Sequence, residues 1–196
     1  MDYKRAQHIA GKIVTHLRKH CREITVGGSI RRRLPEVKDI EIICAPNEVP
    51  AVTDLFGGVT TWERTEDFVD AVTQLGRIEK GDPKEGRYIA IDIANTDGEV
   101  LIRLDLFIPQ YHDYWRMVAI RTGSRQFNFQ ITNAWIKKGW RGTPDGLRLE
   151  SECVSNAAGD WKCTAAEPTL PPAWMSEELF FHWLGLEWVE PIDRTV

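Results

Sequence analysis

Two acidic side chains lie two residues apart in Asp39-Ile40-Glu41, at the start of a run that becomes apolar towards Cys44. In a β-strand, residues two apart point to the same face of the sheet. Two neighbouring carboxylates repel each other unless a cation lies between them. Mg²⁺ prefers oxygen ligands and binds through one or two carboxylates together with substrate phosphates. The pair therefore indicates a magnesium site, although a solvent-exposed strand face would show the same pattern.

A third carboxylate, Asp105, interrupts the otherwise apolar segment 102–108, and Arg103 precedes it by two residues. A lone Asp in such a strand is paired, bound to a ligand or exposed. Arg103 shares its face and could orient a carboxylate between metal-binding events. Two metal ions about 3.5–4 Å apart can clamp the attacking and leaving oxygens of a phosphoryl transfer. Asp39, Glu41 and Asp105 are thus the predicted metal ligands.

A glycine-serine turn, Gly28-Ser29, precedes the acidic pair and is followed by Arg31, Arg32 and Arg33. Glycine-rich turns bring backbone N–H groups close to a phosphate. An arginine can bind phosphate with two parallel hydrogen bonds, so at least one of the three is expected to reach a triphosphate. Each feature is weak alone, but turn, arginines, acid pair and distant third acid in this order indicate a nucleotide-phosphate site.

The elements that must position these residues follow from hydrophobic spacing and turn signals. In the first half we expect a helix from Ala6 that ends near His20, a short strand at 24–26, a loop at 31–38, a strand at 39–44, a connection at 46–61 with a Gly57-Gly58 turn, a helix at 66–75, and a hairpin of strands 87–94 and 99–108.

In the second half we expect helical structure over 114–138 interrupted at 122–124, a small hairpin at 147–163, and a final helix that begins after Ser176 and runs to Leu184. Trp174, Trp183 and Trp188 are expected to pack this part. The order predicts an α+β fold: a mixed β-sheet with helices on one face (residues 1–110), followed by a small α+β subdomain (residues 111–196).

Composition narrows the class of protein. The chain of 196 residues has a net charge of −4, which argues mildly against a dedicated nucleic-acid binder. Its first 40 residues, however, contain ten Lys/Arg and four Asp/Glu, a local net charge of +6. In this quarter Lys12, Arg31 and Arg33 are the predicted nucleic-acid contacts. Four scattered cysteines and the absence of a long apolar run predict a cytoplasmic protein without a membrane segment or a disulfide framework.

Four motifs together resemble the family X DNA polymerases, within the DNA polymerase β nucleotidyltransferase superfamily. The motifs are Gly28-Ser29-x-Arg31-Arg32 followed after six residues by Asp39-x-Glu41, then Arg103-Leu104-Asp105-Leu106-x-Ile108-Pro109, then Thr122-Gly123-Ser124-x-x-Phe127-Asn128, and the tail from Ser176-Glu177-Glu178 to Glu190-Pro191. The first is shared by the wider superfamily, and the last two narrow the resemblance to family X. The resemblance covers nearly the whole chain.

The resemblance implies a role for each matching residue. Asp39, Glu41 and Asp105 would hold two Mg²⁺ ions, for which Mn²⁺ could substitute, and Arg103 would position the acids near the primer terminus. Gly28, Ser29 and Arg32 would bind the β- and γ-phosphates. Thr122 and Gly123 would line the sugar pocket, and Asn128 would contact the incoming nucleotide from the minor-groove side.

The resemblance also implies a template-directed DNA polymerase with palm and nascent-base-pair subdomains. Its substrates would be a dNTP and a primer-template or gapped DNA, with short gap filling in DNA repair as its role. The chain has no room for the N-terminal lyase domain or the helix-hairpin-helix DNA grips, so we expect no lyase activity and weak DNA binding by a monomer. An accessory protein that replaces the missing grips is a candidate partner.

Two departures keep other functions open. Glu41 stands where family X polymerases normally have Asp, and Arg125 stands where an acidic residue often stacks on the base. The first alternative is a template-independent nucleotidyltransferase that acts on RNA, a protein or a small molecule. The second is a catalytically inactive module that only binds a nucleotide. Sugar preference, fidelity and template dependence do not follow from the sequence.

Overall fold

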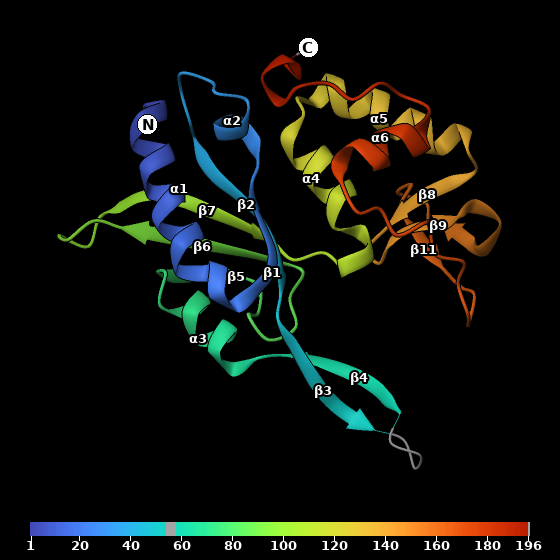
Figure 1. Ribbon diagram of the computed structural model, residues 1–196, viewed down its shortest axis with the longest axis horizontal. Coiled ribbons are helices and arrows are strands. Elements are labelled where there is room, and N and C mark those ends of the chain that lie inside the picture. Colours follow the sequence, from blue (N-terminus) through green and yellow to red (C-terminus); the bar gives the residue numbers. More distant parts are fainter. Residues whose placement is uncertain (54–57, 196) are drawn as a thin grey trace. The chain divides into compact units, whose positions relative to one another are not determined.

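The structure, a computed structural model, describes residues 1–53 and 58–195. The chain divides into two compact units, Met1–Ile108 and Pro109–Val196, which we call unit 1 and unit 2. Both units combine helices with β-strands, so the predicted α+β class is confirmed. Figure 1 shows the helices and strands of each unit.

Unit 1 is built on a five-stranded mixed sheet in the order β1-β2-β7-β6-β5 (Figure 1). Strands β2 and β7 run parallel, and the other neighbouring strands run antiparallel. The sequence does not predict β5, because three of its four residues are charged. The strands are β1 (Cys21–Val26), β2 (Asp39–Pro46), β5 (Arg77–Lys80), β6 (Tyr88–Ala94) and β7 (Val100–Phe107).

Helices α1 (Tyr3–Leu17) and α3 (Glu66–Thr73) cover one face of this sheet, as predicted. Helix α1 begins where the Asp2 carboxylate accepts a hydrogen bond from the Arg5 backbone N–H, a typical N-cap. It continues into a 3-10 turn, η1 (Arg18–His20), so the predicted end near His20 is confirmed. The apolar stripe of α1 packs on alternate strand residues that point to the same side: Ile40, Ile42, Ile89, Ile91, Leu104 and Leu106. Residues between these positions therefore point to the opposite face.

The predicted connection over 46–61 is wrong, because the segment forms an antiparallel ribbon. Strand β3 (Glu48–Thr53) pairs with β4 (Val59–Arg64), and Pro50 lies opposite Trp62. A proline has no N–H to donate to a ladder, and it is tolerated on edge strands. Both strands of a two-stranded ribbon are edges, so Pro50 is compatible with β3. Of the predicted Gly57-Gly58 turn, Gly57 lies outside the described residues.

Unit 2, over residues 109–195, packs three α-helices with two small β-ribbons. Its helices are α4 (Tyr114–Thr122), α5 (Arg125–Lys137) and α6 (Glu177–Leu184), and its 3-10 turns are η2 (Tyr111–Asp113), η3 (Glu150–Glu152) and η4 (Pro191–Asp193). Its strands are β8 (Trp140–Thr143), β9 (Gly146–Leu149), β10 (Cys153–Ser155) and β11 (Trp161–Cys163). Of the predicted tryptophans, Trp174 is buried in its core cluster, and Trp183 and Trp188 are partly buried and pack against that cluster.

The predicted interruption at 122–124 is confirmed. Helix α4 ends at Gly123, whose backbone is extended, and the Ser124 side chain accepts the Phe127 N–H to begin α5. The predicted single hairpin over 147–163 is wrong, because two ribbons are present: β9 pairs with β8, and β10 pairs with β11. The turn before Gly146 closes the first ribbon, since this glycine adopts a φ of 97°.

A buried ion pair connects the end of unit 2 to its helices. The fully buried Arg194 donates from Nη1 and Nη2 to the two carboxylate oxygens of Glu177 at 2.6 and 2.9 Å. Its guanidinium also lies 4.9 Å from the ring centroid of Phe181. The Arg194 carbonyl accepts a hydrogen bond from the Ser124 N–H, so the same residue fixes the start of α5.

We expect Glu177→Ala to lower the free energy of unfolding of unit 2 by about 3–5 kcal/mol, because it leaves the Arg194 charge buried without its carboxylate. Urea unfolding followed by tryptophan fluorescence measures this, since seven of the eight tryptophans lie in unit 2. Glu150→Ala is the matched control. It removes the partner of Arg141 from a site where Glu150 is 44% exposed, and we expect a loss of about 0–1 kcal/mol. Equal losses in the two variants would contradict a dominant role for the buried pair.

Candidate active site

The parallel pairing of β2 with β7 places the predicted acidic residues side by side in unit 1. In register, Asp39 lies beside Arg103 and Glu41 lies beside Asp105. Residues two apart on a strand share a face, and directly paired residues of neighbouring strands do so too. The four side chains therefore form one block on the face of the sheet opposite α1 and α3. The structure thus brings together the four residues predicted to do the chemistry.

The Asp105 carboxylate is held by two donors from its own sheet. Its Oδ1 accepts a hydrogen bond from the Tyr88 hydroxyl at 2.8 Å and one from Arg103 Nε at 3.1 Å. Arg103 Nη2 also donates to the Tyr88 oxygen at 3.4 Å. Burial, and then the bond to Asp105, raises the pKa of Tyr88, so the hydroxyl keeps its proton as a donor at neutral pH. Sequence reasoning missed Tyr88, because only the β6–β7 register brings it to Asp105.

The glycine turn packs directly against Glu41. The Gly27 N–H donates to the Glu41 carbonyl at 2.8 Å and ties the start of α2 (Gly28–Arg31) to β2. Gly28 has a φ of 58°, and a Cβ at this position would lie 2.1 Å from Glu41 Oε2. Glycine is therefore required at position 28 for two reasons: its positive φ, and the close approach of the Glu41 carboxylate.

Two polar groups of this turn, the Ser29 hydroxyl and the Arg32 guanidinium, are suited to binding an anionic ligand. Ser29 Oγ is buried and has no hydrogen-bond partner among the described residues, although buried hydroxyls almost always have one. Burial lowers the pKa of the Arg32 guanidinium, and the nearby charge of Glu41 opposes that shift. A hydroxyl that lacks a partner and a guanidinium beside the acidic block fit an oxyanion such as a phosphate.

The acidic block fits Mg²⁺ in the type of its donors, since three carboxylates share one face of neighbouring strands. As the side chains lie, no group of three His, Cys, Asp or Glu residues within 1–53 and 58–195 converges on a point suited to a metal ion. The contacts of Asp105 supply one reason, because Arg103 and Tyr88 bind one of its oxygens. A metal ion would compete with Arg103 for this carboxylate.

The predicted nucleic-acid contacts of unit 1 do not form one group. Arg31 and Arg33 line a groove of about 340 Å³ between α1 and α2. Lys12 is exposed on α1, and it is not one of the residues that line this groove. The two arginines therefore form a local basic surface, and Lys12 stands apart from it.

In unit 2, the predicted nucleotide residues lie around the turn between α4 and α5. Asn128 Nδ2 donates to the Ile120 carbonyl at 2.6 Å, while its Oδ1 is buried without a partner among the described residues. A Cβ on Gly123 would lie 2.5 Å from this Oδ1. The Thr122 side chain is fully buried, and its hydroxyl donates to the Val118 carbonyl. A ligand at this turn would meet the Thr122 backbone and the Asn128 amide oxygen.

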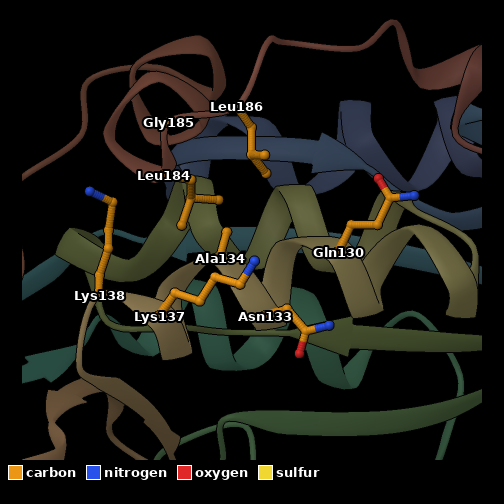
Figure 2. A pocket seen from close by; sticks show the side chains of 8 residues that line it. All are labelled: Gln130, Asn133, Ala134, Lys137, Lys138, Leu184, Gly185 and Leu186. Carbon is orange, nitrogen blue, oxygen red and sulfur yellow. The ribbon is translucent and has the colours of Figure 1, made fainter.

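A second polar surface of unit 2 follows one side of α5 (Figure 2). It is a groove of about 620 Å³. Helix α5 and its C-terminal end supply two lysines and two amides, and the end of α6 supplies apolar groups: Gln130, Asn133, Ala134, Lys137, Lys138, Leu184, Gly185 and Leu186. Lys138 Nζ lies 5.6 Å from the ring centroid of Trp183. This surface combines positive charge with amide donors, which suits an anionic polymer.

Comparison with known protein families finds a match within unit 2. Residues 117–195 match the family model described as DNA polymerase beta thumb. The match confirms the resemblance to the family X DNA polymerases that motifs 122–128 and 176–191 indicate. No curated protein is significantly similar to the chain. Of the helices in the described residues, none combines the length and apolar character needed to cross a membrane.

We expect Gly28→Ala to destabilise unit 1 more than Gly98→Ala, although both residues have a positive φ. A residue with a side chain at such a φ costs about 1–2 kcal/mol. Around Gly98 a Cβ would meet nothing within 4 Å, whereas at Gly28 it would clash with Glu41. Urea unfolding of the two variants isolates the clash as the excess loss at position 28. Equal losses would contradict the close packing of Glu41 on the turn.

Proposed function

We propose that this family X polymerase-like chain is a metal-dependent DNA polymerase that adds a dNTP to a primer 3′-hydroxyl, with short gap filling as its role. The observation that carries the proposal is the register of β2 and β7, which aligns Glu41 with Asp105 and Asp39 with Arg103 beside a glycine-serine turn. The thumb match over residues 117–195 supports a DNA substrate. Nucleotidyl transfer needs carboxylates that bind metal ions and a turn that binds phosphate. Unit 1 contains a block of carboxylates and a glycine-serine turn whose Ser29 hydroxyl has no partner among the described residues.

In this proposal Asp39, Glu41 and Asp105 would hold two Mg²⁺ ions. When bound, such ions lower the pKa of an attacking hydroxyl and neutralise charge on the leaving pyrophosphate. Arg103 and Tyr88 hold Asp105 Oδ1 in place, so the carboxylate keeps a defined orientation in the absence of a cation. Arg103 is therefore a positioning residue for Asp105, and a bound cation would compete with it for the carboxylate.

The turn residues bind the triphosphate. Ser29 Oγ, which has no partner among the described side chains and backbone groups, donates to a phosphate oxygen. Arg32 lies beside Glu41 and balances negative charge both on the acid and on the nucleotide. In unit 2, taken by itself, the Asn128 amide and the backbone at Thr122-Gly123 are the proposed contacts for a base and a sugar. The lack of a side chain at Gly123 leaves room for the Asn128 amide oxygen, which a Cβ at this position would meet at 2.5 Å.

The distribution of charge favours DNA binding at local basic surfaces. The whole chain has a net charge of −4, so attraction to DNA must come from basic surfaces. Arg31 and Arg33 supply one in unit 1, Lys12 adds a separate charge, and the α5 groove supplies another in unit 2. Few phosphate contacts give weak binding with a shallow dependence on salt, and an accessory DNA-binding protein would compensate for the low affinity.

Primer extension on DNA with a single-nucleotide gap tests the proposal, with Mg²⁺ and each dNTP supplied alone. We expect addition of the nucleotide that complements the template. Addition of all four alike would show a template-independent transferase, and no addition with any nucleotide would refute the polymerase proposal. The variants described next test whether the activity arises from the proposed active site.

Asp39→Asn, Glu41→Gln and Asp105→Asn are each expected to lower the extension rate about 10²–10³-fold, because each removes one strong electrostatic contribution at the reacting phosphate. Asp92→Asn is the matched control. Asp92 pairs in register with Arg103 on the same sheet, but its carboxylate binds Arg77 at 3.0 Å. Its variant should extend primers close to the wild-type rate. An unchanged extension rate in Asp105→Asn would show that the activity does not arise from this acidic block, and would favour the alternative of a palm that only binds nucleotide.

Replacement of Lys137 and Lys138 by glutamate is expected to weaken binding to gapped DNA. It should also reduce the slope of log K against log salt by about 1 for each phosphate that is no longer neutralised. Fluorescence anisotropy over a salt series measures both effects. Lys84→Glu makes the same type of charge change on a surface that also carries Glu63, Glu66 and Glu85, and it should leave DNA binding nearly unchanged. Similar weakening at Lys84 would show that only net charge matters.

A further inference from the structure

Two cysteines lie directly opposite each other in unit 2. On the ribbon of β10 and β11, Cys153 is the register partner of Cys163. Just outside this pair the Thr164 N–H donates to the Glu152 carbonyl at 2.9 Å. In an antiparallel ladder, that bond flanks a pair whose own backbone groups do not bond to each other. Cys153 and Cys163 therefore form a non-hydrogen-bonded pair.

The geometry of such a pair suits a disulfide. Non-hydrogen-bonded partners have Cα atoms about 4.5 Å apart, and their side chains are closer than in the alternate pairs. Disulfides occur at Cα separations of about 4.4–6.8 Å. Both thiols are free and half-buried. Burial, and then the neighbouring Cys163, raises the pKa of Cys153, which favours the protonated thiol at neutral pH.

The turn between the strands fixes this register. Asn156 Oδ1 accepts the backbone N–H groups of Ala158 and Asp160 at 2.9 and 2.8 Å. Asn156 Nδ2 donates to the Asp160 carboxylate at 3.1 Å, and Gly159 adopts a φ of 85°. Turn geometry sets the register of a hairpin, so the thiols are held opposite each other.

The other two cysteines supply an internal comparison. Cys21 and Cys44 also contact each other, but they are 8% and 0% exposed in the core of unit 1. Their register partners are Pro46 and Ile24, so they are not directly opposed. A dissolved oxidant reaches a half-buried thiol on a surface ribbon more readily than a thiol inside a packed core.

We propose that Cys153 and Cys163 are a reversible redox site that closes the β10–β11 ribbon with a disulfide when the chain meets an oxidised low-molecular-weight thiol. One protein thiolate attacks the oxidant disulfide and releases one small thiol, leaving a mixed disulfide. The second protein thiolate attacks the protein sulfur of that bond and releases the other small thiol. Two protein thiols are oxidised, one disulfide is reduced to two thiols, and both protons leave with them.

Closure would stiffen a ribbon that anchors neighbouring parts of unit 2. The Trp161 ring lies under the Arg141 guanidinium of β8, 4.8 Å from its centroid. The Glu152 carboxylate accepts the Thr169 backbone N–H at 2.9 Å and the Thr169 hydroxyl at 2.5 Å. These contacts tie the ribbon to β8 and to the segment that leads to α6. The redox state of the two cysteines would thus determine how firmly β8 and the segment that leads to α6 are held.

The test equilibrates the full chain with mixtures of glutathione and glutathione disulfide, under native conditions and in concentrated urea. Free thiols are then trapped with a maleimide, and peptide mass mapping locates each modification. We expect a bond that joins Cys153 to Cys163 in the native chain, with Cys21 and Cys44 still reduced. The equilibrium constant for that bond should be at least about tenfold larger in the native chain than in urea, because only the folded ribbon holds the thiols together.

The variants Cys153→Ser and Cys163→Ser provide the matched controls. Each should take up one glutathione at the remaining thiol and form no internal disulfide. The proposal is overturned if the native wild-type chain accumulates glutathione on both thiols without joining them, or if the bond forms equally well in urea. A disulfide that persists in Cys153→Ser would show that another pair of cysteines reacts.

Discussion

The parallel pairing of β2 with β7 is the constraint on which the candidate site depends. It sets Glu41 beside Asp105 and Asp39 beside Arg103, and no loop could hold four charged side chains in so regular a block. A one-residue slip would turn the acids of one strand towards the helices and its apolar residues outwards. The stripe of α1 and the core residues of α3 resist that slip, because they bury Ile40, Ile42, Leu104 and Leu106 on the other face.

A cluster of three carboxylates must also be compensated in the absence of a cation. Unit 1 does this with groups from two strands, β6 and β7, and from the glycine-serine turn. Arg103 and the Tyr88 hydroxyl bind one oxygen of Asp105, and Arg32 stands near Glu41. A cation that bound these acids would therefore compete with the same groups that stabilise them. This explains how the fold can keep a negatively charged block on one face without losing its register.

In unit 2, the buried contacts position a short turn between two helices rather than a charged face of a sheet. Its core is rich in aromatic rings, and a fully buried Arg194 joins Glu177 on α6 to the chain end. The Arg194 carbonyl then receives the Ser124 N–H at the start of α5. The turn that carries Gly123 and Asn128 is thus positioned by residues that lie more than 50 positions further along the chain. Unit 2 also contains the β10–β11 ribbon, which the proposed disulfide between Cys153 and Cys163 would stiffen.

The sequence by itself determined the elements with strong local signals. Helix α1, the interruption at Gly123, the Ser176 cap of α6 and the acid spacing of β2 all follow from residue spacing and capping chemistry, and motifs 122–128 and 176–191 indicated the thumb. Local signals could not reveal the β3–β4 ribbon, where the Gly57-Gly58 pair suggested a turn within a connection.

Only the tertiary structure decided which distant residues meet. Tyr88 reaches Asp105 across the β6–β7 register, the Glu41 carboxylate packs on Gly28, and Cys153 faces Cys163. These contacts depend on strand pairing, and pairing is chosen by the burial of whole faces rather than by any one segment. A pattern within a strand shows which side chains share a face, but the neighbouring strand and its register are properties of the folded sheet.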